Sequence, residues 1–285
     1  MKDYAFEVER SVLECRGGDV VRFLNGQLSN DVNKLQPNLA MHACVMTAKG
    51  RMNAEVWLTK IADGIRLDGP PNMGEELLAR FERYIISDDV TVEEVAGIKL
   101  YHVTGDFRDF AENQKANEIQ YNLSRRFNRD GLDYWIPKGS HCRYSHNVEN
   151  LTPDQFESFR IAQGVPRWGA ELDENTLPVE AGLDRDCIDY HKGCYIGQEV
   201  ISRLKSVGHV NRLLIRLIAD KHSTMARGTK LFFDEQPIGT ITSEARSLDL
   251  ENVVALAYVK RAYSTPGTMI VTENGERLTV HTLQL

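Results

Sequence analysis

Long apolar runs are missing from this chain of 285 residues. The apolar stretch at residues 215–218 is already broken by the charge of Arg216, and no stretch approaches the ~20 apolar residues of a membrane-spanning helix. Residues 1–7 carry acidic side chains and lack the apolar core of a signal peptide. The sequence therefore predicts a cytoplasmic protein with no membrane segment.

Paired cysteine motifs and an excess of basic residues are also missing. The five cysteines are odd in number, and no two form a C-x-x-C pair: Cys15, Cys44, Cys142, Cys187 and Cys194. This pattern argues against a disulfide framework and a zinc cage, so we predict no metal site and a reducing compartment. The net charge of −7, from 41 acidic and 34 basic residues, argues against direct binding of nucleic acid, which requires a basic surface.

The first 150 residues mix helical and strand patterns. Apolar spacing predicts a helix over residues 20–28, and a second helix follows Asn72 in a capping-box arrangement. A third begins after Thr152, with Gln155 completing its capping box and Gly164 ending it. Helices mixed with strands at this rhythm predict an α+β core. We expect its strands at residues 40–47, 55–60, 65–68 and 98–104.

The C-terminal part reads as strands alone. Asn274-Gly275 predicts a type I′ hairpin turn, because both residues accept a positive φ. Six short strands predict a small closed antiparallel barrel, which leaves no exposed sheet edge. We therefore expect one domain over residues 1–207 and a β-barrel domain over residues 208–285. The six strands are expected at residues 212–219, 230–234, 238–244, 253–259, 269–273 and 277–283.

Residues 178–205 contain a dense polar cluster around one thiol. Lys192 precedes Cys194 by two residues, and a neighbouring ammonium lowers the pKa of a thiol, so Cys194 is a candidate reactive group with Lys192 as its activator. Glycines on both sides remove side chains where a ligand approaches or where φ is positive. The supporting residues of this cluster are Gly193, Tyr195, Gly197, Gln198 and Glu199.

Plainer interpretations exist for each of these residues. A single cysteine in a reducing compartment is more often a packing residue than a reactive one, and the two glycines are also compatible with an ordinary turn. Cys187 lies seven residues before Cys194, so a pair of the two, or a shared metal, is a further alternative.

Residues 192–199 match the K-G-C-Y-x-G-Q-E signature of the YgfZ-type folate-binding proteins at every specified position. Three further segments resemble that family: residues 23–32 (F-L-x-G-Q-x-T-N-D-V, with Ser29 for Thr), residues 160–166 (R-I-x-x-G-x-P) and residues 178–183 (P-x-E-A-G-L). The chain is thus similar to relatives of the glycine-cleavage T protein (aminomethyltransferase), a group that includes a mitochondrial iron–sulfur assembly factor. The resemblance spans about residues 17–203.

This resemblance implies an α+β fold of two ferredoxin-like α/β units that form a folate-binding core, the second at roughly residues 50–140, plus the C-terminal six-stranded barrel. It implies tetrahydrofolate or a derivative as the cofactor. The implied partners are a reduced folate and iron–sulfur client or assembly proteins. Nothing in the sequence requires more than a monomer.

The sequence departs from the T protein at two places. An acidic pair assists aminomethyl transfer there, and residues 50–55 supply Glu55 as at most one of the two acids. The T protein also binds the pterin through a Glu, and the matching residue here is Ala162. Losing that acceptor leaves pterin donors unpaired unless another carboxylate substitutes. Glu180 is the expected substitute, and its plain alternative is a surface or capping carboxylate.

Four further residues are candidate folate contacts. Trp168 is suited to stacking on the pterin or benzoyl ring, although a buried structural Trp fits equally. Arg203 is suited to the anionic glutamate tail, with a solvated basic edge as the alternative. Asn30 and Asp31 either line the folate cavity or cap backbone groups where the first helix ends.

These features lead to one main hypothesis and two alternatives. The main hypothesis is a folate-binding accessory factor for assembly or repair of [4Fe–4S] proteins, which affects tRNA modification indirectly and is not a classical aminomethyltransferase. The first alternative is a tetrahydrofolate-dependent aminomethyl or one-carbon transferase. The second is a binding module in which the Cys194 thiol has no role.

Overall fold

The computed structural model describes residues 2–105, 120–140, 148–206, 208–248 and 252–283. Two compact units make up the chain: Met1–Leu151 with Asp186–Gln198, and Thr152–Arg185 with Glu199–Leu285. The boundary expected at 207/208 lies shortly before the first barrel strand, which begins at Arg212, whereas the second unit also includes Thr152–Arg185. Cys142 falls outside the described residues.

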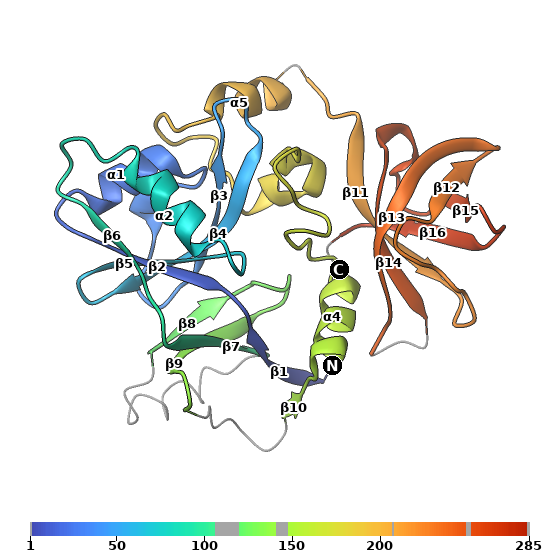
Figure 1. Ribbon diagram of the computed structural model, residues 1–285. Helices are drawn as coiled ribbons and strands as arrows, with labels where there is room; N and C mark the ends of the chain where they lie inside the picture. Colours follow the sequence, from blue (N-terminus) through green and yellow to red (C-terminus); the bar gives the residue numbers. More distant parts are fainter. Residues whose placement is uncertain (1, 106–119, 141–147, 207, 249–251, 284–285) are drawn as a thin grey trace. The chain divides into compact units, whose positions relative to one another are not determined.

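The first unit contains two five-stranded sheets (Figure 1). The first sheet has the order β3-β4-β5-β2-β6, and all its neighbouring strands are antiparallel. Its strands at residues 40–47, 55–60 and 65–68 were expected from the sequence, while β2 and β6 were not. The strands are β2 (Ser11–Arg16), β3 (Met41–Met46), β4 (Met52–Ile61), β5 (Gly64–Gly69) and β6 (Thr91–Glu94).

The second sheet has the order β10-β1-β7-β9-β8, in which β1 and β10 run parallel. Only β7 was expected from the sequence, and it spans the expected residues. This sheet includes β1, from the very start of the chain. The second ferredoxin-like unit expected at roughly residues 50–140 therefore does not contain the whole sheet. The strands are β1 (Asp3–Val8), β7 (Ile98–Thr104), β8 (Gln120–Ser124), β9 (Gly131–Pro137) and β10 (Val148–Asn150).

Buried ion pairs join the two sheets. Arg126 donates to both oxygens of Asp68 on β5, at 2.8 and 2.9 Å, and to Asp133 Oδ2 on β9 at 2.8 Å. Asp133 Oδ1 lies 2.7 Å from His102 Nδ1 on β7. Each guanidinium and carboxylate thus has a partner, as buried charges require. Of the strands that escaped prediction, β8 buries polar side chains, Asn122 and Ser124, and so shows no apolar alternation.

Two short helices accompany the first sheet: α1 (Val20–Gln27) and α2 (Gly74–Glu82). The capping box expected at Asn72 is wrong, because α2 begins two residues later with Met73 as its N-cap and no side-chain cap. Asn72 instead takes a positive φ of 63° in the preceding turn, which Asn tolerates better than most residues.

The second unit begins with helix α4 (Pro153–Ala162), which forms as the sequence predicts. The Thr152 hydroxyl accepts from Gln155 N, and the Gln155 side chain accepts from Thr152 N, so the capping box is complete. Gly164 follows with a φ of 69°, and a Cβ there would lie 1.9 Å from Leu283 O. Only glycine fits this position.

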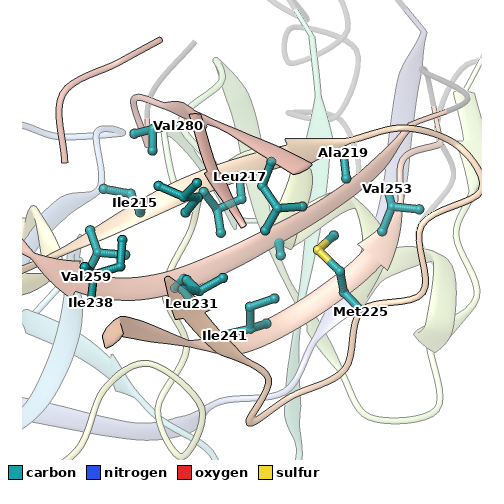
Figure 2. Packing of buried hydrophobic residues seen from close by; sticks show 14 residues of the cluster. Ile215, Leu217, Ala219, Met225, Leu231, Ile238, Ile241, Val253, Val259 and Val280 are labelled. Atoms are coloured by element: carbon teal, nitrogen blue, oxygen red, sulfur yellow. The ribbon is translucent and has the colours of Figure 1, made fainter. Parts of the chain in front are cut away.

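Six antiparallel strands then close into a barrel in the order β11-β14-β13-β12-β15-β16. The α+β fold with a C-terminal six-stranded barrel is therefore as expected. Figure 2 shows the apolar side chains that fill the barrel, among them Leu217, Leu231 and Ile241. The strands are β11 (Arg212–Ala219), β12 (Lys230–Phe233), β13 (Gln236–Arg246), β14 (Val253–Lys260), β15 (Met269–Thr272) and β16 (Arg277–His281).

The turn expected at Asn274-Gly275 differs from the prediction. Only Gly275 has a positive φ, at 84°, and Gly275 N donates to Thr272 O, so the loop is not a type I′ turn. Two consecutive positive φ values occur instead at Asp234 and Glu235, in the two-residue loop between β12 and β13. Within the described parts of the chain, no helix is long and apolar enough to cross a membrane.

Candidate functional site

The segment Asp186–Gln198 belongs to the first unit, and two adjacent side chains fasten its start to β3. The Ser29 hydroxyl donates to Cys187 O at 2.5 Å and accepts from Cys44 N at 2.8 Å. Asn30 Nδ2 donates to His42 O at 2.8 Å and to Asp186 O at 3.0 Å. These four bonds hold the segment against the strand that carries His42 and Cys44.

Lys192 fastens the middle of the segment to the end of α1. Its ammonium donates to three backbone carbonyls, Asn25 O, Leu28 O and Asn30 O, at 2.6, 2.7 and 2.8 Å. A lysine ammonium has three N–H donors, so all of them are used. Burial lowers the pKa of Lys192 to about 8, against the opposing influence of nearby carboxylates.

Lys192 was expected to activate the Cys194 thiol, but its contacts are with backbone carbonyls. With every donor bound to a carbonyl, the ammonium has none left for the Cys194 sulfur. Lys192 instead satisfies carbonyls that the helix leaves without an intrahelical partner, as basic side chains near a helix C-terminus do. It is a positioning residue of the segment.

Gly193 and Cys194 are both exposed, between two buried neighbours, Lys192 and Tyr195. The Lys192 ammonium lies 5.0 Å from the centroid of the Tyr195 ring. Burial raises the pKa of the Tyr195 phenol well above its ordinary range, so the ring stays neutral beside the cation. The Cys194 thiol is thus displayed on a two-residue projection that is anchored on both sides.

Gly197 explains why the segment turns where it does. Its φ is 88°, and a Cβ would lie 2.7 Å from Thr47 O and 3.3 Å from Gly50 Cα. The segment therefore packs directly on the turn that connects β3 and β4. Gly193 differs, because no described heavy atom lies within 4 Å of its Cβ position. The space beside Cys194 is open.

Cys187 is buried, whereas Cys194 is exposed. The two do not form a disulfide, since both thiols are free. Cys187 Sγ is 3.0 Å from His42 Nδ1, and His42 Nε2 is 3.1 Å from Glu55 Oε2. Cys44 is close to Cys187, because Ser29 Oγ bonds to Cys187 O and to Cys44 N. The alternative of a Cys187–Cys194 pair is wrong.

Glu55, the acid that remains from the T-protein pair, is already engaged. Its Oε1 accepts from Arg10 at 2.5 Å, and Arg10 also donates to Asp68 Oδ1 at 2.6 Å. Burial would raise the pKa of Glu55, but the Arg10 guanidinium and the His42 imidazole hold it below its ordinary range. Glu55 is therefore an ionised, doubly paired carboxylate.

The candidate folate residues of the first unit act as capping groups. The Asn30 Nδ2 group donates to the two carbonyls described above, and Asn30 Oδ1 accepts from Asp31 N. Asp31 Oδ1 accepts from Asn33 N at 3.1 Å, at the start of the short helix Val32–Lys34. Of the two interpretations for this pair, the contacts are those of backbone capping.

The second unit holds the remaining candidates. Glu180 is buried, and its Oε2 accepts from Arg212 Nε at 3.0 Å, with the guanidinium 4.4 Å from the Tyr258 ring. It is thus no surface carboxylate. Trp168 is half-buried in a bridge with Leu172.

Helix α5 (Gln198–Ser206) starts at the last residue of the segment, and its side chains are mostly exposed. Arg203 Nη2 and Glu199 Oε1 are 2.7 Å apart, one helical turn from each other. Both side chains are largely exposed, so this is a surface ion pair of small stabilising value. Gln198 is half-buried at the first position of the helix.

Three contributors to this site were not found from the sequence. Ser29, His42 and Arg10 come from distant parts of the chain, and their contacts depend on tertiary structure. Ser29 alone had a signal, since it lies in a matched segment, at a position where the family carries Thr. Among the described residues, no group of three or more His, Cys, Asp or Glu side chains is placed to hold a metal ion.

Comparisons with known proteins show a common fold. Residues 212–284 match the family model of the glycine cleavage T-protein C-terminal barrel domain. The crystal structure of the glycine cleavage system aminomethyltransferase T from Bartonella henselae has a TM-score of 0.83 to this chain, covering 99% of it and 86% of that structure, at 20% identity. The chain therefore has the fold of that aminomethyltransferase, and its C-terminal barrel matches the T-protein barrel domain.

Two kinds of protein are similar to this chain in sequence. The mitochondrial iron-sulfur cluster assembly factor IBA57 homolog of Phaeosphaeria nodorum is 24% identical over 225 residues, which is 72% of this chain and 53% of that protein. The aminomethyltransferase of Francisella tularensis is 23% identical over 94% of this chain and 81% of its own length. That of Streptomyces avermitilis is 32% identical over 135 residues, a third of its length. The matched region thus spans about half of the first relative.

Proposed function

We propose that this chain is a folate-binding accessory factor for the assembly or repair of [4Fe–4S] proteins. The observation that carries the proposal is the exposed Cys194 thiol, held between the buried side chains of Lys192 and Tyr195. A thiol presented in this way is accessible to a protein partner, while its backbone is too well anchored to move away. The likeness to an iron-sulfur cluster assembly factor supports this assignment.

The role of each residue follows from its contacts. Lys192 and Gly197 fix the backbone on both sides of Cys194, and the open space beside Gly193 admits the partner. The Cys194 sulfur then contacts an iron site of a client or assembly protein, where a thiolate is the natural ligand. Any effect on tRNA modification would pass through such clients, in keeping with the net charge of −7.

A reduced folate is the expected cofactor of a T-protein-like scaffold, and buried polar groups of the first unit fit such a ligand. Asn122 Oδ1 and Nδ2 and Trp135 Nε1 are buried with no hydrogen-bond partner in the described structure. A pterin edge offers the matching alternation of donors and acceptors. Separately, the family resemblance predicts Glu180, Trp168 and Arg203 of the second unit as folate contacts. Bound folate would supply or accept a carbon unit.

The test is the activity of a [4Fe–4S] enzyme in cells that lack this gene. Wild-type chain is expected to restore the activity, and Cys194→Ala is expected not to, although its fold is unchanged because the side chain is exposed. Cys15→Ala, at a buried cysteine outside the segment, serves as the control and should restore activity if it folds. Full enzyme activity in the deletion strain would remove the proposal.

A second candidate function is a tetrahydrofolate-dependent aminomethyl or one-carbon transferase, favoured by the end-to-end match to the Francisella enzyme. Its weakness is Glu55, which Arg10 and His42 hold as a paired carboxylate. Purified chain incubated with tetrahydrofolate and an aminomethyl donor should form no methylenetetrahydrofolate above the background rate. Turnover in this assay, abolished by Glu55→Gln, would favour the transferase.

A further inference from the structure

A second thiol site lies inside the first unit, separate from Cys194. Cys187 and Cys44 are completely buried, and they lie close together because Ser29 Oγ bonds to Cys187 O and to Cys44 N. Cys187 Sγ is also 3.0 Å from His42 Nδ1, whose Nε2 is 3.1 Å from Glu55 Oε2. Two thiols, an imidazole and an orienting carboxylate therefore form one continuous cluster.

The backbone of the cluster is fixed by a single hydroxyl. Ser29 Oγ bonds to Cys44 N and to Cys187 O, so both cysteines are held by the same atom. Cys44 and His42 lie two residues apart on β3 and thus share one face of the sheet, the face that Cys187 covers. These bonds hold the backbones of the two cysteines close together.

The imidazole is held just as firmly. Its ring stacks on Trp57 at a centroid distance of 4.2 Å and an interplanar angle of 10°. Glu55 is ionised, so Nε2–H donates to it, and Nδ1 is left with a lone pair that accepts the Cys187 thiol proton. A general base in contact with a thiol and oriented by a carboxylate is the arrangement that activates a nucleophile.

His42 is the most exposed side chain of the cluster. Its side chain keeps 15% of its surface exposed, whereas both sulfurs keep none. Burial raises the pKa of the Cys187 thiol well above its ordinary value, with the neighbouring Cys44 acting in the same direction. The resting sulfur therefore keeps its proton until a base takes it.

We propose that Cys187 and Cys44 form a dithiol site that reduces small hydroperoxides and closes to an intrachain disulfide, with His42 as the general base. His42 Nδ1 takes the Cys187 proton, and the sulfur attacks one peroxide oxygen. The O–O bond breaks, the alkoxide or hydroxide leaves with that proton, and Cys187 becomes a sulfenic acid. Cys44 Sγ then attacks the Cys187 sulfur and releases water. Two thiols and one hydroperoxide give one disulfide, one alcohol (or water from hydrogen peroxide) and one water.

The first experiment uses the wild-type chain. Purified, fully reduced protein is treated with hydrogen peroxide, the remaining thiols are alkylated, and the non-reduced digest is analysed by mass spectrometry. A peptide that links Cys44 to Cys187 is expected, together with the loss of two thiols per chain. Oxidation confined to Cys194, with Cys44 and Cys187 still alkylated after denaturation, would overturn the proposal.

Variants separate the two steps. Cys44→Ser is expected to stop at the sulfenic acid, which dimedone traps on Cys187. His42→Asn keeps a polar group near Nδ1 but removes the base, and the rate of disulfide formation should fall at least tenfold. Cys194→Ser is the matched control and should form the disulfide at the wild-type rate. An unchanged rate in His42→Asn, with native circular dichroism, would refute the role of the imidazole.

This site is independent of the proposed function, because it uses neither Cys194 nor a folate. A chain that fails to support [4Fe–4S] enzymes but forms the Cys44–Cys187 disulfide would remove the first proposal and leave the second intact.

Discussion

The Lys192 ammonium lies 5.0 Å from the centre of the Tyr195 ring, and the two residues enclose the exposed pair Gly193-Cys194. Both side chains are buried, and a cation above an aromatic face is a favourable contact. The thiol is therefore presented by a short, rigid projection and not by a loose loop. This arrangement gives each residue of the segment a separate and testable role.

Replacing Lys192 should destabilise the first unit more than it alters the thiol. In Lys192→Met, three carbonyls lose the donor that satisfies them, and we expect the free energy of unfolding to fall by about 2–4 kcal/mol. Urea denaturation measures this loss, and Lys138→Met, at an exposed position, should change it by less than about 0.5 kcal/mol. An equal loss of unfolding free energy in both variants would show that the three Lys192 hydrogen bonds do not stabilise the first unit.

Replacing each of the two glycines of the segment by alanine should destabilise the protein to very different extents. Gly197→Ala puts a Cβ at 2.7 Å from Thr47 O with φ at 88°, so we expect a loss of about 2–3 kcal/mol. Gly193→Ala meets open space and should cost less than about 0.5 kcal/mol. Thermal unfolding of the pair gives the comparison. If partner access needs the space beside Cys194, Gly193→Ala should nevertheless reduce the rescue of a [4Fe–4S] enzyme.

Asp133 should make stability depend on acid. Burial alone would raise its pKa, but Arg126 and His102 lower it to about 2. The unfolded carboxyl titrates near 3.9, so the ion pair contributes fully above that pH and is lost as the pH falls towards 2. We expect the stability advantage of wild type over Asp133→Asn, about 2 kcal/mol at pH 6, to shrink by about half at pH 3.

Urea titrations at several pH values between 3 and 6 measure this difference. Asp130→Asn provides the control, because Asp130 is 80% exposed and pairs only with the exposed Arg125. A difference between wild type and Asp133→Asn that stays constant over this pH range would show that folding does not shift the pKa of Asp133.

Glu180 tests the proposed folate contact. Glu180→Gln keeps the shape of the side chain but removes the charge, and we expect the Kd for tetrahydrofolate to rise at least tenfold, which corresponds to ~1.4 kcal/mol. Isothermal titration calorimetry measures it, with the exposed Glu174→Gln as the control. A lower Tm with an unchanged Kd would mean that Glu180 serves Arg212 alone.

Local patterns predicted those elements whose signals are local. The capping box of α4 needs only Thr152, Pro153 and Gln155, which are adjacent in sequence, and it forms as expected. The barrel strands were found because one face of each is apolar. Strands such as β8 escaped, since its buried side chains, Asn122 and Ser124, are polar and show no apolar alternation.

The sequence by itself determined which segment carries the exposed thiol, the α+β class and the closed barrel, because motifs, alternating apolar residues and turn residues act over a few positions. Only the tertiary structure decided what Lys192 binds and which thiol Cys187 meets. Lys192 reaches carbonyls more than 160 residues away, and Cys187 reaches His42 across 145 residues. Such contacts depend on how segments dock, because hydrogen bonds to distant backbone atoms leave no periodic trace in the chain.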